Sequence, residues 1–352
     1  MTSHCPQQTD AFRDLSRIFA NREDRVLEFE ILPPAFGPLL EDGYSIGITK
    51  KYLVEAFVIA RRAFFDPSTP KSNPHYIDDA PLEEVDKKRA IASEIILLFD
   101  CEHLTACNWR KRRLSASSAS DLETSIRALD TELSLMTTYL CSPLHRHTKS
   151  PTLWQHRLWV QTHLVRLRKP DFKGVEGLFQ AELSVVLRAG ELHPKNYYAF
   201  TYLRQICRIL AESGGVKSEE WRIRLGQSII GCTLDWCLAH PADISGLMFL
   251  LYLLDSVPDT VLQLDTVGKV ARFALDIGWE GESIWTFVGL ATRKFKLVES
   301  LGQSPPYPWG VLRAASSLAT RGDSKAGIPW RTWLERARVH AAAEQIIEPS
   351  HN

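Results

Sequence analysis

A repeated segment constrains the fold of this chain more than any other feature of its sequence. The clearest copy runs from Leu192 to Leu210, LHPKNYYAFTYLRQICRIL. When its residue pair 199–200 is aligned with four similar segments, the second member of the pair falls at positions 107, 154, 200, 247 and 285, with spacings of 47, 46, 47 and 38 residues. Each copy follows an apolar run with helical periodicity. We therefore expect an all-α array of about five helical hairpins, each burying its inner face against its neighbours.

Each repeat is predicted to supply two antiparallel helices. The predicted pairs are 82–99 with the segment 101–114, 122–140 with 151–169, a helix around 178–187 with 196–211, 221–238 with 243–254, and 267–277 with 282–297. Ser120 and Glu123 predict a capping box at the start of the third helix, and Ser150 followed by Pro151 predicts a capped start of the fourth. The apolar segment 244–254 is expected to be buried on several sides.

The repeat array is predicted to occupy residues 82–298, between two other regions. Residues 1–81 form an N-terminal region with short helices at 9–20 and 49–65 and an extended segment at 26–31, followed by a loop containing Gly43 and Gly47. A proline-rich loop at 66–81 closes this region, because proline disfavours helix and strand interiors. Residues 299–352 are predicted to form helices that cap the array.

Composition excludes several classes of protein. Lys plus Arg and Asp plus Glu each number 42 among the 352 residues, so no net charge favours nucleic acid or a membrane surface as partner. The seven cysteines form no C-x-x-C pair, which favours reduced, mostly buried thiols in a cytoplasmic protein and no metal site. The start of the sequence lacks signal-peptide features, and the apolar run 244–254 is too short for a transmembrane segment.

Three segments carry a resemblance to a known family. They are LTACNWRK at 104–111, SPTLWQHRLWV at 150–160 and KNYYAF at 195–200. Together they resemble the repeat of the protein prenyltransferase alpha subunits, in which a helix opens with a motif close to N-Y-x-A-W-x-x-R. The resemblance covers roughly residues 85–298. Residues 28–57 are most similar to the repeat-containing-protein-1 group of this family.

The resemblance implies a right-handed α-α superhelix, a crescent that wraps a beta subunit of the Rab-geranylgeranyltransferase type. In such a heterodimer this chain would be the structural alpha subunit and would hold no cofactor, whereas the zinc and the lipid cavity would belong to the beta subunit. The complex would transfer a geranylgeranyl group from geranylgeranyl diphosphate, bound at the seam, to the cysteine thiol of a protein substrate. The alternative is a helical-repeat adapter without transferase activity.

The resemblance also implies functional residues around position 195. Lys195 matches a family lysine that reaches toward the diphosphate, where a cation would stabilise the charge that grows on the leaving oxygen. The alternative is that Lys195 lies on the surface without a role. Tyr197 and Tyr198 are candidates for lining the substrate channel, with packed tyrosines as the alternative. Asn196 is expected to cap the following helix and to have a secondary binding role.

Six further residues are candidates for the partner interface: Trp109, Arg110, Trp154, His156, Arg157 and Arg204. For the three arginines, pairing with an acid on a neighbouring helix of the same chain is the alternative, and for the tryptophans it is the hairpin core. The sequence departs from the family motif at Cys107, in place of tryptophan, and at Leu203, in place of arginine. His145 and His147 are expected to be exposed loop residues.

Overall fold

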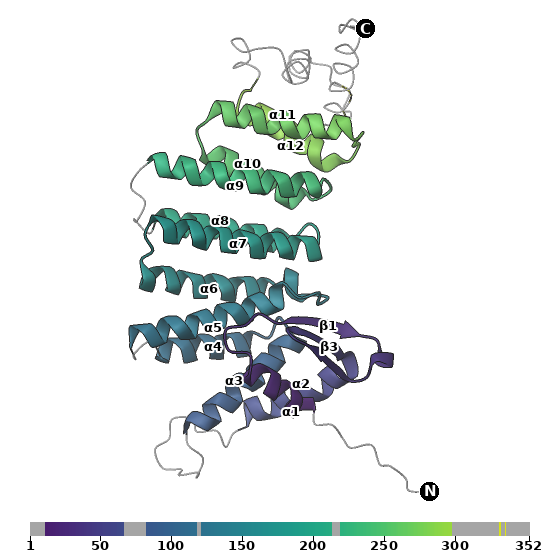
Figure 1. Cartoon of the computed structure of the whole chain (residues 1–352), viewed down its shortest axis with the longest axis vertical. Helices are drawn as coiled ribbons and strands as arrows, with labels where there is room; N and C mark the ends of the chain where they lie inside the picture. The colour runs from purple at the N-terminus through teal and green to yellow at the C-terminus, as the bar shows by residue number, and fades with distance from the viewer. Residues whose placement is uncertain are drawn as a thin grey trace, which may run out of the picture. The chain divides into compact units, whose positions relative to one another are not determined.

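The computed structural model describes residues 11–66, 82–117, 121–212 and 219–297, together with Arg331 and Glu335 (Figure 1). The chain divides into two compact units, Met1–Gly215 and Val216–Asn352. The N-terminal region therefore belongs to the same unit as the first three hairpins.

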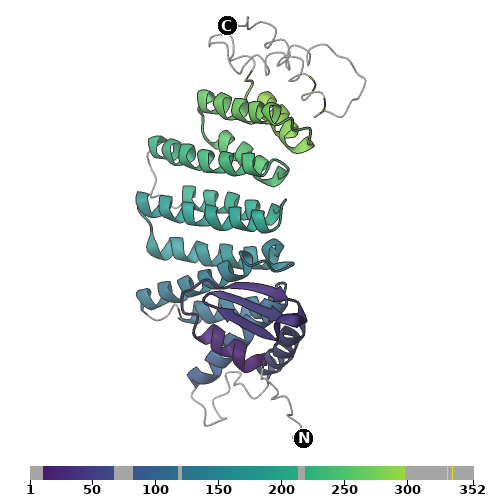
Figure 2. The same ribbon diagram turned by 45° about the vertical axis from the view of Figure 1, so that its right-hand side comes forward.

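The N-terminal region combines two helices with a small sheet (Figure 2). Helices α1 (Ala11–Ala20) and α2 (Lys50–Phe65) confirm the predicted helices. Between them lie β1 (Glu28–Leu32), the 3-10 turn η1 (Pro34–Phe36), β2 (Leu39–Asp42) and β3 (Ser45–Thr49). The strand order is β1-β3-β2, with β1 parallel and β2 antiparallel to β3. The predicted loop around Gly43 is thus a β-hairpin, whose turn uses the positive φ of Gly43 (59°).

Side chains of helix α5 (Leu122–Leu140) and of the residues just after it attach the sheet to the hairpins. The backbone amides of Leu27 and Phe29 donate to the hydroxyls of Thr138 (3.0 Å) and Ser142 (2.9 Å). These hydroxyls accept hydrogen bonds that a neighbouring strand would otherwise accept along the free edge of β1. The buried Arg22 adds a bond to the Ser134 hydroxyl (2.6 Å), which explains why the N-terminal region belongs to the first unit.

Three helical hairpins complete the first unit and confirm the predicted pairs. They are α3 (Leu82–Phe99) with α4 (Leu104–Ser117), α5 with α6 (Pro151–Arg168), and α7 (Phe172–Leu192) with α8 (Tyr197–Glu212). The 3-10 turn η2 (His147–Lys149) precedes α6. Ser150 caps α6 by accepting from the Leu153 amide, as predicted. The cap of α5 is instead Asp121, which accepts from the Thr124 amide, and Ser120 lies outside the described residues.

The second unit contains two more hairpins, also as predicted. They are α9 (Glu219–Ala239) with α10 (Ile244–Ser256), and α11 (Thr260–Asp276) with α12 (Glu282–Lys294). Six residues of α10 are buried: Gly246, Leu247, Phe249, Leu250, Leu253 and Leu254. The predicted capping helices at 299–352 lie outside the described residues, apart from Arg331 and Glu335.

The aligned repeat position forms the core of every hairpin. Its five occupants are at most 2% exposed: Cys107, Trp154, Phe200, Leu247 and Trp285. In the first unit a cluster of Leu114, Leu129, Val160 and Leu164 joins α4, α5 and α6. The six cysteines in the described residues are free thiols. Among the helices that the structure describes, none combines the length and apolar character needed to cross a bilayer.

Candidate functional site

The turn between α7 and α8 exposes Lys195 and two tyrosines. Lys195 is exposed and adopts a left-handed backbone conformation with φ of 60°. Tyr197 and Tyr198, in the first turn of α8, are 63% and 43% exposed, and their rings meet edge to face at 5.8 Å. The side chains of Tyr197 and Tyr198 are therefore accessible to a ligand or a second protein. The alternative of packed core tyrosines does not apply to either.

Asn196 anchors this turn to the preceding hairpin. Its Oδ1 accepts from the Ala199 amide (3.2 Å), so it caps α8 as predicted. Its Nδ2 donates to the Thr148 carbonyl (2.6 Å) in η2. The Asn196 side chain is completely buried, which leaves it a positioning role beneath Lys195 and no direct contact with a ligand.

Lys149 makes a second connection between the two hairpins. Its Nζ donates to the Pro194 carbonyl (2.9 Å), one residue before Lys195. The His193 Nδ1 is also hydrogen bonded to the Thr148 hydroxyl (2.6 Å). Burial lowers the pKa of His193, and the positive charges of Lys149 and His145 lower it further. The α7–α8 turn therefore lies in basic surroundings, which favour an anionic ligand.

Lys149, which lies in η2 and contacts this turn, was missed by the sequence analysis. It stands five positions before Trp154, just as Lys195 stands five positions before Phe200 in the aligned repeat. Extending the alignment by five residues toward the N-terminus was enough to find it. The bond to Pro194 could not be read from that spacing, because it depends on how the two hairpins pack.

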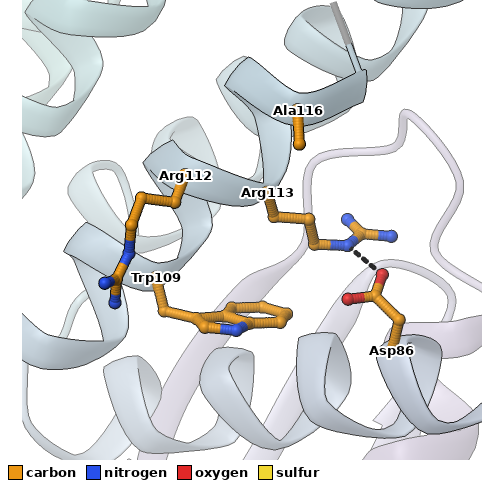
Figure 3. A pocket seen from close by; sticks show the side chains of 5 residues that line it. All are labelled: Asp86, Trp109, Arg112, Arg113 and Ala116. Atoms are coloured by element: carbon orange, nitrogen blue, oxygen red, sulfur yellow. Dashed lines mark hydrogen bonds and ion pairs between the residues drawn. The ribbon is translucent and has the colours of Figure 1, made fainter. Parts of the chain in front are cut away.

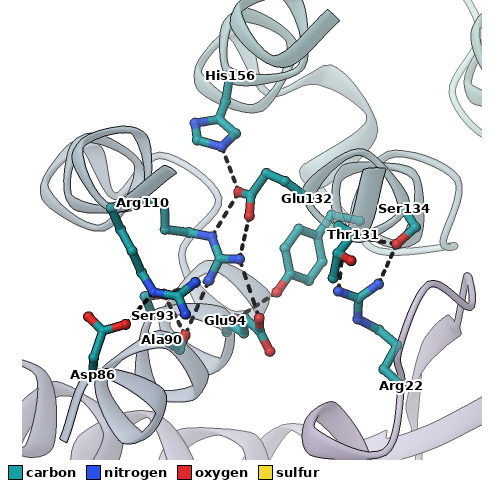
Figure 4. Close-up of polar contacts among 12 residues, drawn as sticks. Arg22, Asp86, Ala90, Ser93, Glu94, Arg110, Thr131, Glu132, Ser134 and His156 are labelled. Atoms are coloured by element: carbon teal, nitrogen blue, oxygen red, sulfur yellow. Dashed lines mark hydrogen bonds and ion pairs between the residues drawn. The ribbon is translucent and has the colours of Figure 1, made fainter. Parts of the chain in front are cut away.

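Glu132 on α5 is the centre of a buried ionic cluster (Figure 4). Arg110 of α4 donates to both of its carboxylate oxygens, at 2.8 and 2.5 Å, and His156 of α6 donates from Nε2 at 2.7 Å. Arg110 also reaches the Glu94 carboxylate of α3 at 3.3 Å. Burial alone would raise the pKa of Glu132, but the charge of Arg110 and the bonds from His156 and Arg110 outweigh it and hold the pKa well below its usual range.

Glu182 on α7 repeats this arrangement one hairpin further along. Arg157 of α6 donates from Nε and Nη2 to its two oxygens, both at 2.8 Å. Tyr202 of α8 and Gln161 of α6 donate to the same carboxylate, at 2.5 and 2.6 Å. In both clusters an arginine of one hairpin binds a glutamate of the next, and a residue on the second helix of that next hairpin completes it. These clusters fasten successive hairpins together.

This geometry revises the predicted interface residues. Four of the six are buried among residues of this chain: Arg110, Trp154, His156 and Arg157. Trp154 also donates its indole N–H to the Thr148 carbonyl (2.8 Å). A partner cannot reach these side chains, so pairing within the array and packing in the hairpin core are the roles that the structure shows. Trp109 and Arg204 are half-buried and keep surface for a partner.

The arginine of the motif is replaced by Leu203 in the third hairpin. Leu203 is fully buried, and Arg204 beside it is half-buried. The equivalent arginines, Arg110 and Arg157, pair inside the chain. The replacement of the third one by Leu203 therefore changes internal packing and removes no residue from the surface.

Of the two histidines before α6 that were predicted to be exposed, one is exposed and the other is not. His145 is exposed, but His147 is buried and donates from Nε2 to the Leu97 carbonyl (3.0 Å). Burial lowers its pKa to about 4. Within the described residues, no three His, Cys, Asp or Glu side chains gather as a metal site would require.

Residues 179–210 match the protein prenyltransferase alpha subunit repeat. The match begins within α7, spans the turn with Lys195 and Asn196, and ends in α8. No curated protein matches the chain. The matched segment is thus the hairpin that carries the exposed lysine and tyrosines.

Proposed function

We propose that this chain is the alpha subunit of a heterodimeric protein prenyltransferase. The repeat at 179–210 points to a prenyltransferase alpha-subunit-like protein, and this observation carries the proposal. In the proposed complex a beta subunit of the Rab-geranylgeranyltransferase type supplies the zinc and the lipid cavity. The proposed reaction is transfer of a geranylgeranyl group from geranylgeranyl diphosphate to a protein cysteine. Membership of the repeat-containing-protein-1 group is also part of the proposal.

The proposed contribution of this chain to the chemistry is electrostatic. In the transfer, a thiolate forms a bond to the allylic carbon while the bond from that carbon to the diphosphate oxygen breaks. Negative charge then grows on the leaving diphosphate, and a nearby cation stabilises it most where water is excluded. Lys195 suits this role because it is exposed on a turn that Asn196 and Lys149 hold in place.

Tyr197 and Tyr198 are proposed to contact the lipid donor or the beta subunit. Exposed tyrosines offer large apolar rings together with a hydroxyl that can bond across an interface, and aromatic residues are enriched at such surfaces. Trp109 and Arg204 remain proposed interface residues, because both keep accessible surface. An obligate complex of this kind is expected to bury roughly 2,000 Å² or more.

Co-expression with a beta subunit tests the proposal. The chain is produced with Rab-type beta subunits from its own source, and the purified material is assayed for transfer of geranylgeranyl from its diphosphate to a cysteine-bearing protein. We expect a one-to-one complex that transfers the lipid, and no transfer by either chain alone. A chain that forms no complex, or a complex that is silent toward every lipid diphosphate, would instead identify a helical-repeat adapter.

A further inference from the structure

A cleft of about 610 Å³ lies between α3 and α4 in the first unit (Figure 3). Its walls are Asp86 of α3 and four residues of α4: Trp109, Arg112, Arg113 and Ala116. The indole of Trp109 lies between the side chains of Arg112 and Arg113 in this view. The cleft is larger than a single phosphate or carboxylate group and is widely open to solvent.

The indole of Trp109 is held in a fixed position. The ring of Phe64 meets it edge to face at 5.6 Å. The guanidinium carbon of Arg89 lies 5.4 Å from the centre of the indole and 4.9 Å from the centre of the Phe64 ring. A fixed and half-buried aromatic ring on the wall of a cleft is a surface on which another planar group can stack.

The cleft carries an excess of positive charge. Arg113 is neutralised by Asp86, with Nε and Oδ2 2.5 Å apart. Neither Arg89 nor Arg112 forms an ion pair within the parts of the chain that the structure describes, and the buried Nε of Arg89 has no hydrogen-bond partner there. Burial lowers the pKa of Arg89 and the charge of Arg112 lowers it further, whereas the charge of Asp86 raises it. An anion in the cleft would meet the exposed guanidinium of Arg112.

We propose that this cleft binds a mononucleotide, with its base stacked on Trp109 and its phosphate held by Arg112. Aromatic rings stack on bases of any sequence, and guanidinium forks match the oxygens of a phosphate. Both features are needed to explain the cleft, because a patch for free anions would not require a fixed ring. The proposal shares Trp109 with the proposed partner interface, so a nucleotide and a beta subunit would compete for this ring.

Calorimetric titration of the full chain tests this assignment with three probes: AMP, ribose 5-phosphate without a base, and adenosine without a phosphate. We expect AMP to bind and each fragment to bind at least about tenfold more weakly, because each keeps only half of the contacts. No binding of AMP, or equal binding of AMP and ribose 5-phosphate, would overturn the proposal. Tighter binding of O-phosphotyrosine than of AMP would also overturn the assignment to a nucleotide.

A matched pair of variants locates the binding site. Arg112→Ala removes an exposed guanidinium from the cleft and should weaken AMP binding about tenfold or more. Arg127→Ala removes an arginine that is 67% exposed on α5 and pairs only loosely, at 3.7 Å, with Glu123. It should leave AMP binding unchanged. Equal effects of the two substitutions would show attraction by general surface charge and would contradict the cleft as the site.

Discussion

Arg157 and Glu182 form a two-armed ion pair, 2.8 Å on each arm, between the second and third hairpins. Both side chains are only 2% exposed, so neither charge is solvated by water. The pair therefore fixes how α6 packs against α7, the helix that leads to the turn with Lys195. Any displacement along this junction would separate two buried charges, which is costly in free energy.

Replacing Arg157 with methionine should destabilise the first unit by about 3–5 kcal/mol, because Glu182 would remain buried without its cation. Urea unfolding measures this change. Arg168→Ala is the control on the same helix: Arg168 pairs with Asp130, but the two side chains are 43% and 33% exposed. That control should cost less than about 1 kcal/mol. Equal losses in the two variants would contradict the role assigned to the buried pair.

His147 should make stability depend on pH in a defined window. Its pKa is about 4 in the folded chain, mainly because of burial, and about 6.5 in an unfolded chain. Between these values the unfolded chain binds the proton first, so stability falls as the pH drops from about 6.5 to about 4, by about 3 kcal/mol in total. Unfolding curves at several pH values should show this loss in the native chain and a smaller one in His147→Gln.

The exposed neighbour His145 provides the control for that measurement, since His145→Gln should keep the full pH dependence. A His147→Gln chain whose stability falls as steeply as that of the native chain would exclude His147 as the source.

Asn196 should be irreplaceable even by a good helix-capping residue. Asn196→Asp keeps an acceptor for the Ala199 amide but removes the donor to the Thr148 carbonyl and brings two oxygens together. We expect a loss of about 1–3 kcal/mol in urea unfolding, at least as large as that of Asn196→Ala. The side chain of Asp259, which caps α11, accepts from the Leu262 amide, so Asp259→Asn should be almost neutral. An Asn196→Asp chain of native stability would mean that capping is the whole role.

The helices could be predicted because their signals are local. The repeat spacing, which is 46 or 47 residues in all but the last interval, together with the cap at Ser150 and the proline at 151, indicates where α6 and its equivalents begin. The three-stranded sheet was missed because β1 pairs with β3 across 17 residues, as Phe29 with Ile46, and no periodicity within either short strand reports that pairing. The predicted cap of α5 was one residue too early, because Ser120 and Asp121 are both residue types that cap helices well.

The site was predicted less completely than the fold. Sequence predicted the cap at Asn196, because it belongs to a motif that is continuous along the chain. It did not place Arg110 and Arg157 inside the chain, because their partners Glu132 and Glu182 lie 22 and 25 residues away on neighbouring helices. Only packing decides whether such an arginine meets an internal acid or a partner.

The turnover of the co-expressed complex, compared between two lysine variants, tests the account most directly. Lys195 and Lys169 are both exposed and both left-handed, but Lys169 ends α6 and lies outside the α7–α8 turn. We predict that Lys195→Ala slows geranylgeranyl transfer about 100-fold, as loss of a charge-stabilising group typically does, and that Lys169→Ala leaves it unchanged. An unchanged turnover in Lys195→Ala, or equal losses in both variants, would contradict the assignment of this hairpin to the chemistry.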